Sequence, residues 1–280
     1  MAIPIINMWK DYFTVSRDEG LGSSYERIIL NIILLKLCER LGIRTVLECP
    51  SFGFTGISGI NSLGLAKKGR SVTIVDHNPE RIELIKKIWH EADESAEFIY
   101  SDDYVELPFN DKQFDLSWNF AALWYVKDLN TFLSELSRIS GKAVFLGVPN
   151  PSGLGFNLLK FFGKKHLQNG IHQEYMQPSN FIPIMEYLGW KLTEQDYFDI
   201  PPWPDIAMPK EKLLAKVGLS GFLNKQNEEK SPLNIMDYYK GEKPEFEQDM
   251  LKYSWLENRA SGPVKWLWAH HRYFIFERVN

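Results

Sequence analysis

The sequence predicts an α/β domain built on an open, mostly parallel sheet with helices on both faces. Three observations support this prediction. Short apolar strands alternate with helical patterns from residue 44 to residue 150, a glycine-rich segment (residues 50–59) follows the first strand, and the second strand closes on an acid, Asp76. Strands that alternate with helices are typical of parallel sheets, because each helix returns the chain to begin the next strand in the same direction.

Apolar side chains at helical or alternating spacing mark each element in turn. A helix is expected over residues 24–41, ending at Gly42. The expected strands are residues 44–49, 71–76, 96–100, 114–119, 142–150, 190–198 and 271–279, and the further expected helices are residues 60–69, 79–92, 129–140 and 178–189. Together they predict a seven-stranded sheet.

The chain divides into four expected parts. Residues 1–43 form an N-terminal helical segment, residues 44–200 the core of the sheet, and residues 267–280 the final strand of that core. Residues 201–266 lie between the last two strands and are rich in proline, tryptophan and charge. We expect this insertion to be irregular and to form a lid over a substrate pocket, with a packed subdomain or a dimer interface as the alternative.

Composition restricts the classes of function. A hydrophobic content of 44% in 280 residues is ordinary for a globular protein. The net charge of −4 argues against nucleic acid as the main partner, since phosphate binding needs a basic face. The N-terminus lacks a signal-peptide pattern, and the most apolar stretch, residues 28–41, is too short and too charged to cross a bilayer. We expect a cytoplasmic protein without a membrane partner.

A ligand site is expected where the first strands end, because open parallel sheets bind ligands beyond the carboxyl ends of their strands. Glycines follow the first strand, an acid closes the second, and two aspartates follow the third. Glycines allow close backbone approach, and an acid at the second strand can accept both hydroxyls of a ribose. Singly, these features are also typical of a tight connection, a helix cap or a solvated turn. Combined, they predict an adenosine-containing ligand held by Gly53, Gly56, Gly59, Asp76, Asp102 and Asp103.

Three segments in order carry a resemblance to a known family. Residues 59–87, 107–140 and 173–192 resemble the class I S-adenosylmethionine-dependent methyltransferases of the ubiquinone-biosynthesis type. The resemblance runs from about residue 44 to residue 150, with weaker similarity on either side. It implies a Rossmann-like, doubly wound fold, methyltransferase activity and S-adenosylmethionine as the cofactor.

The resemblance also implies roles for single residues. Glu48 takes the place of the acid that closes the first strand, and Gly59 lies beside the methionine part of the cofactor. Asp76, with His77 next to it, would hold the ribose. Either Asp102 or Asp103 would contact the adenine amino group. The further implied contacts are Asn119 and Phe120 beneath the methionine end and Tyr25 over its amino-acid group.

The cofactor loop departs from the family pattern. The family reads D-x-G-x-G-x-G, whereas Pro50 and Phe52 stand at the first two glycine positions here. The loop has therefore been remodelled, or cofactor binding has been lost. The second reading would make the chain a non-catalytic binding or interaction module.

A third reading is an NAD(P)-dependent dehydrogenase. The glycine spacing G-x-x-G-x-x-G and the pair Tyr187 and Lys191 resemble short-chain dehydrogenases. However, Tyr187 stands where a helix ends, and no serine lies at the usual distance before it. We therefore prefer the methyltransferase.

Methyl transfer is an in-line displacement that needs alignment and exclusion of water, with a base only where the acceptor must lose a proton. The candidate bases are His172, Tyr175 and Asp205. We expect a small-molecule acceptor ahead of a protein acceptor, and the sequence carries no signal for the oligomeric state. Although His172, His270 and His271 suggest a metal, nothing fixes a ligand geometry, and we expect no metal site.

Overall fold

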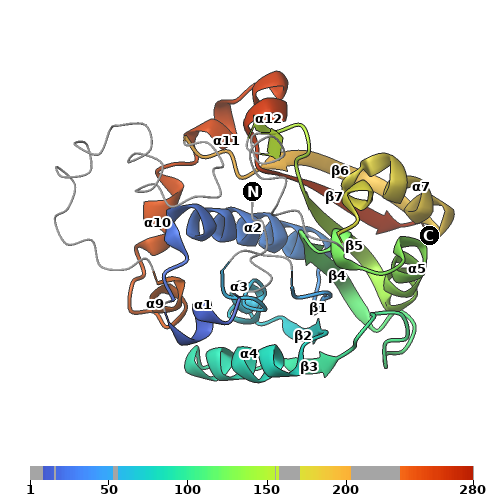
Figure 1. Ribbon diagram of the computed structural model, residues 1–280, viewed down its shortest axis with the longest axis horizontal. Coiled ribbons are helices and arrows are strands. Elements are labelled where there is room, and N and C mark those ends of the chain that lie inside the picture. Colours follow the sequence, from blue (N-terminus) through green and yellow to red (C-terminus); the bar gives the residue numbers. More distant parts are fainter. Residues whose placement is uncertain are drawn as a thin grey trace.

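The computed structural model describes residues 9–15, 17–52, 56–154, 156–157, 171–202 and 234–279 (Figure 1). The strands are β1 (Thr45–Glu48), β2 (Ser71–Asp76), β3 (Glu97–Tyr100), β4 (Phe114–Phe120), β5 (Ser140–Pro149), β6 (Trp190–Phe198) and β7 (His271–Arg278). They form one seven-stranded sheet in the order β3-β2-β1-β4-β5-β7-β6. The first five are parallel, and β7 runs antiparallel to both β5 and β6. The expected fold class, a doubly wound and mostly parallel sheet, is confirmed.

Helices cover both faces of this sheet. The α-helices are α1 (Asp11–Thr14), α2 (Gly20–Leu41), α3 (Leu63–Ala66), α4 (Pro79–Glu91), α5 (Leu129–Ile139), α7 (Pro178–Tyr187), α9 (Ile235–Tyr239), α10 (Phe246–Leu251), α11 (Trp255–Arg259) and α12 (Gly262–Trp268), and the 3₁₀ turns are η1 (Leu123–Tyr125) and η2 (Gln173–Met176). Alternate strand residues enter two separate cores. Val46 packs with α2, α3 and α4, whereas its neighbour Leu47 packs with α5 and α7. Burial on both faces explains why the strands read as continuous apolar runs.

Local sequence sets several helix ends as expected. Asn78 caps α4 by accepting a hydrogen bond from the backbone N–H of Arg81, and Pro79 occupies the first turn. Asp128 caps α5 through the backbone N–H of Thr131. Helix α2 ends at Gly42, which takes the left-handed conformation at φ 58°. The two caps fix where α4 and α5 begin, just beyond the carboxyl ends of β2 and β4.

Two elements differ from expectation. The helix expected over residues 60–69 is only the single turn α3, because Asn61 and Ser62 are buried and turn toward Glu48 at the end of β1. The insertion is not irregular where the structure describes it, since residues 234–268 form α9 to α12. Helices α9 and α10 place apolar side chains at helical spacing into the core beside α2. Residues 203–233, including Trp203 and Asp205, lie outside the described residues.

Within the described part of the chain, no helix combines the length and the apolar character needed to cross a bilayer.

We expect the core under α5 to dominate stability. Leu136 is 0% exposed against the sheet, whereas Leu267 on α12 is 40% exposed. Leu136→Ala should lower the free energy of unfolding by about 2–5 kcal/mol, since it leaves a cavity that the sheet cannot fill. Leu267→Ala is the matched control and should change it by less than about 0.5 kcal/mol. Urea denaturation of both variants measures the difference, and equal effects would contradict this packing.

Candidate functional site

The carboxyl ends of β1, β2 and β4 bring three predicted residues to one edge of the sheet. Glu48 ends β1, Asp76 ends β2, and Asn119 lies at the end of β4. All three are buried, with 2%, 0% and 0% of their surface exposed. Because these strands are parallel neighbours, their ends share one edge, as the sequence predicted.

Asp76, the expected ribose ligand, is fully engaged by the chain itself. Its Oδ1 accepts hydrogen bonds from Arg81 Nη2 at 2.6 Å and from the backbone N–H of Asn78 at 2.8 Å. Its Oδ2 accepts from Arg81 Nε at 2.9 Å and from Ser51 Oγ at 2.6 Å. The Arg81 guanidinium is thus a bidentate partner, 1% exposed. The sequence analysis missed it, although its place in the first turn of α4 put it within reach.

Phe52, which the family resemblance places at a glycine position of the cofactor loop, covers this ion pair. The Arg81 guanidinium lies 4.0 Å from the centre of the Phe52 ring and 5.1 Å from that of Trp9. Phe52 also contacts His77 and Tyr125, with ring centres 5.6 and 5.5 Å apart. A cation against aromatic faces is attracted by their electrons. The remodelled loop therefore stabilises the Arg81 guanidinium where it pairs with Asp76.

The loop glycines make room for the protein's own side chains. Gly56 and Gly59 have φ values of 110° and 71°, which favour glycine. A Cβ at Gly56 would lie 2.6 Å from Glu19 Oε1, and one at Gly59 would lie 2.5 Å from Ile85 Cδ1. Gly59 thus lies close against Ile85 of α4, and Gly56 lies close against Glu19, the residue that precedes α2. Gly53 lies outside the described residues.

A buried polar network links the residues before α3 to α2. Arg27, 0% exposed, pairs with Glu19 at 2.5 Å and donates to Asn61 Oδ1. Glu48 accepts hydrogen bonds from Ser62 Oγ at 2.6 Å and from the Asn61 amide at 3.5 Å. Burial raises the pKa of Glu48 to about 7. Glu19 and Arg27 were missed in the sequence, because a charged pair in a helical pattern reads as a solvated face.

Asn119 differs from its neighbours. Both of its side-chain amide atoms are buried and make no hydrogen bond to any described residue. A buried amide without partners is costly, so such a group in a native protein calls for a ligand or water. The adjacent Phe120 ring packs against the His271 ring, with centres 4.7 Å apart.

The residues expected near an adenine differ in how they are held. Asp102 is exposed, and the Asp103 carboxylate accepts from the backbone N–H of Val105 at 3.1 Å. His77 Nδ1 lies 2.6 Å from the Tyr104 hydroxyl. Burial lowers the pKa of His77, which favours its neutral form.

Two of the three candidate bases lie on the η1 side of the site. The backbone N–H of His172 donates to the Trp124 carbonyl at 2.8 Å, and its ring stacks on Tyr175 with centres 4.6 Å apart. Tyr125, next to Trp124, in turn contacts Phe52. The third candidate, Asp205, lies outside the described residues.

The expected contact from Tyr25 and the dehydrogenase pair are placed differently. Tyr25 is buried, and its hydroxyl donates to Glu257 Oε1 of α11 at 3.2 Å. Tyr187 ends α7 and is 91% exposed, so it does not face the residues gathered at the strand ends. That position argues against the dehydrogenase reading.

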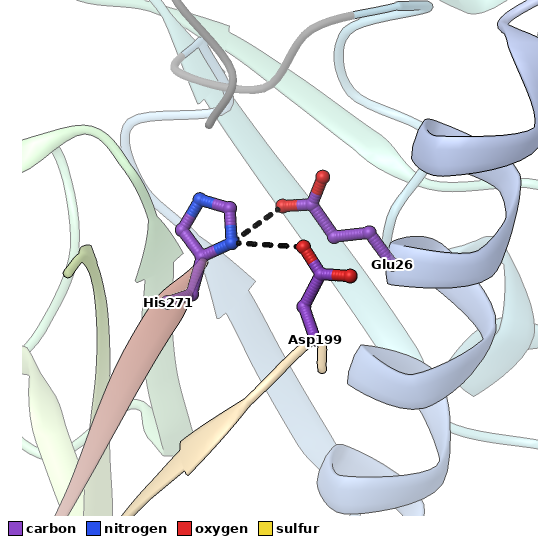
Figure 2. Close-up of side chains that lie close together, drawn as sticks. All are labelled: Glu26, Asp199 and His271. Atoms are coloured by element: carbon purple, nitrogen blue, oxygen red, sulfur yellow. Dashed lines mark hydrogen bonds and ion pairs between the residues drawn. The ribbon is translucent and has the colours of Figure 1, made fainter. Parts of the chain in front are cut away.

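A second polar cluster lies where β6 ends and β7 begins, facing α2 (Figure 2). His271 Nδ1 is 3.2 Å from Glu26 Oε1 and 3.3 Å from Asp199 Oδ2, and His270 Nδ1 is 2.8 Å from the same Asp199 oxygen. Burial and the charge of Asp199 raise the pKa of Glu26 well above its usual range, and burial lowers the pKa of His271 to about 4. The histidines therefore pair with acids here, and His172 is not part of this group.

The chemical types of these side chains suit the polar groups of S-adenosylmethionine. Asp76 supplies carboxylate oxygens of the type that accept from ribose hydroxyls, and Asn119 supplies a buried amide that makes no hydrogen bond within the described part of the chain. In the conformation described, however, both oxygens of Asp76 are taken. A ribose could bind there only after the Arg81 guanidinium had moved away.

Glu48 should make stability depend on pH. Its folded pKa of about 7 lies above the ordinary value of a glutamate, so the folded protein keeps a proton that the unfolded chain has released. Its contribution to stability is therefore present below the unfolded pKa and lost as the pH rises through about 7. From about pH 5 to about pH 8, Glu48→Gln should gain stability relative to wild type. Urea midpoints measure this, with exposed Glu83→Gln as control; a constant difference would contradict the raised pKa.

Comparisons with known proteins agree with this fold. Residues 54–145 match the family model described as a methyltransferase domain. A search of curated protein sequences found no match. Among solved structures, the chain is similar to magnesium protoporphyrin IX methyltransferase from Synechocystis PCC 6803, which carries bound SAH. The TM-score is 0.55 at 12% identity, over 98% of this chain and 94% of that one. It is also similar to YcgJ from Bacillus subtilis, with a TM-score of 0.51 at 13% identity over 89% and 97% of the two chains.

At sequence identities this low, the solved structures show only the shared fold. The family model additionally identifies the matched residues as similar to a methyltransferase domain. The strand order with an antiparallel β7 is that of the class I methyltransferases. Residues 54–145 therefore match a methyltransferase domain, and the sheet has the fold of the class I methyltransferases, a class whose cofactor is S-adenosylmethionine.

Proposed function

We propose that this protein transfers a methyl group from S-adenosylmethionine to a small-molecule acceptor. The observation that carries the proposal is the placement of Asp76 and Asn119 at one sheet edge, at the ends of the strands on either side of β1. Asp76 holds buried carboxylate oxygens that Arg81 now occupies, and Asn119 holds a buried amide that no described residue hydrogen-bonds. The matched methyltransferase domain supports the same reaction.

The chain's own residues would bind and orient the cofactor. When bound, S-adenosylmethionine supplies a methyl group already activated on a sulfonium. Asp76 would accept from the ribose hydroxyls, the exposed Asp102 would meet the adenine, and Asn119 would face the methionine end. Pairing of Asp76 with Arg81 keeps this position filled in the absence of ligand. Asp76, the carboxylate proposed to bind the ribose, is thus buried and already paired with a positive charge.

The acceptor side is proposed to involve α11 and α12. These helices carry exposed apolar residues, among them Trp255 at 50% and Trp266 at 49%. Helix α12 is fastened to the sheet by an ion pair between Lys265 and Asp196 at 2.7 Å, and Trp268 donates to the Pro201 carbonyl. An apolar cover of this kind would exclude water from the transfer. His172 and Tyr175 remain our candidate bases for an acceptor that must lose a proton.

Cofactor binding should depend on Asp76. We expect wild type to bind S-adenosylmethionine with a micromolar dissociation constant, worth about 8 kcal/mol, and Asp76→Asn to weaken it at least about tenfold. The matched control is Asp111→Asn, because the Asp111 carboxylate is exposed and pairs with Arg138, outside the candidate site. Calorimetry measures binding, and methyl transfer from a labelled cofactor to pooled small molecules tests the reaction. If folded wild type did not bind S-adenosylmethionine, the methyltransferase proposal would be wrong and a non-catalytic interaction module would be favoured.

The Arg81 guanidinium should compete with the ribose. Arg81→Met keeps an apolar stem of similar length but cannot pair with Asp76, so the cofactor should bind more tightly than to wild type. The same change should destabilise the ligand-free protein by about 3–5 kcal/mol, because it leaves a buried carboxylate without its charge partner. Thermal unfolding with and without S-adenosylmethionine measures both effects.

The double variant Arg81→Met with Asp76→Asn is the control for this experiment. It should recover part of the lost stability, because no buried charge remains, and yet bind the cofactor poorly. Weaker binding by Arg81→Met alone would show that the guanidinium contacts the cofactor instead of competing with it.

A further inference from the structure

Three buried side chains from separate elements converge where β6 and β7 meet α2. Glu26 lies in α2, Asp199 directly follows β6, and His271 begins β7. They are 4%, 2% and 0% exposed. Figure 2 shows both carboxylates pointing at the same nitrogen of the His271 ring.

Hydrogen bonds from the described residues do not satisfy all the polar atoms of these three side chains. His271 Nδ1 faces Glu26 Oε1 at 3.2 Å and Asp199 Oδ2 at 3.3 Å, but a neutral imidazole carries only one proton on that nitrogen. Glu26 Oε1 makes no hydrogen bond to any described residue. A buried carboxylate oxygen without a donor, beside a second carboxylate, is costly. A cation between the two acids would satisfy both.

The distances suit a metal ion. One ligand atom from each residue, the His271 nitrogen and a carboxylate oxygen from each acid, lies within 4.8 Å of the others. With metal–ligand bonds of about 2.1 Å, the two nitrogen–oxygen separations would subtend about 100° at a common centre. That angle lies between octahedral and tetrahedral geometry, and both are common for divalent ions of this series.

The surroundings hold the ligands in place. Asp199 has a φ of 60°, which is strained for a residue other than glycine, and such strain concentrates at functional sites. His270 Nδ1 lies 2.8 Å from Asp199 Oδ2 and orients that carboxylate. Glu257 accepts from the backbone N–H of Ile200 at 2.7 Å, which fixes the chain just after Asp199.

We propose that Glu26, Asp199 and His271 form a binding site for one divalent first-row transition ion such as Zn²⁺. Two carboxylates balance the charge of such an ion, and imidazole with carboxylate is a donor set that these metals accept. This departs from the expectation of no metal, because no spacing of residues in the sequence places a residue of α2 beside the last two strands. The ion would join α2 to β6 and β7, one ring contact away from Phe120 of the candidate cofactor site. The inference stands independently of the proposed methyl transfer.

Metal uptake by the full chain tests this site. Protein stripped with a chelator is incubated overnight with Co²⁺ or Zn²⁺, freed of unbound metal, and analysed for metal per chain. We expect about one ion per chain, and a visible Co²⁺ spectrum of nitrogen and oxygen ligation. Glu26→Gln and His271→Gln should each lower the uptake at least about tenfold.

Two variants serve as matched controls. Glu83→Gln alters an exposed acid outside the cluster, and His90→Gln alters an exposed histidine. Both should take up metal as wild type does. No uptake by folded wild type, or full uptake by folded Glu26→Gln and His271→Gln, would overturn the proposal.

X-ray absorption of Zn²⁺-loaded wild type keeps the test decisive if the variants fail to fold. Nitrogen and oxygen neighbours with imidazole scattering would support the site. Sulfur ligation by Cys38 or Cys49 would overturn it. Calorimetry with S-adenosylmethionine, run on the metal-free protein, keeps a failure here separate from a failure of cofactor binding.

Discussion

The ion pair between Asp76 and Arg81 is the constraint on which the candidate site depends. Asp76 has to be buried because it ends a strand that helices cover on both faces, and a buried carboxylate needs a charge partner. Arg81 supplies that partner from the first turn of α4, and Phe52 packs over its guanidinium. Phe52 is therefore the side chain by which this loop covers the pair, at a position where the family resemblance would place a glycine.

The same logic extends to the other buried charges. Arg27 pairs with Glu19 and donates to Asn61, which in turn donates to Glu48, so a chain of hydrogen bonds runs from α2 to the end of β1. Asn119 stands outside this network with no hydrogen bond to a described residue. The hydrogen bonds of Arg27, Asn61 and Glu48 are thus supplied by the chain itself, whereas the Asn119 amide is left to bond a ligand or water.

The insertion between the last two strands is part of the core as much as a cover. Helices α9 and α10 pack beside α2, and the amide of Asn31 in α2 donates to the Tyr239 hydroxyl at 2.9 Å. Helix α11 reaches Tyr25 of the same helix through Glu257. Helix α2 is therefore held from both sides, which places Glu26 opposite Asp199 and His271. A motion of α2 would disturb the polar cluster and the residues before α3 together.

The sequence by itself determined the strand and helix pattern, the sheet class, and the meeting of Glu48, Asp76 and Asn119 at one edge. These follow from periodicity, capping residues and the rule that parallel strands end together, all of which are local or topological. Only the tertiary structure decided that Arg81 occupies the Asp76 carboxylate, that Gly56 and Gly59 admit Glu19 and Ile85, and that His271 faces two acids. The contacts of Gly56, Gly59 and His271 join residues far apart in the chain, whereas Arg81 follows Asp76 by only five residues and meets it because α4 turns back over the end of β2. Side-chain pairing across such distances depends on how the elements pack, which no spacing of residue types records.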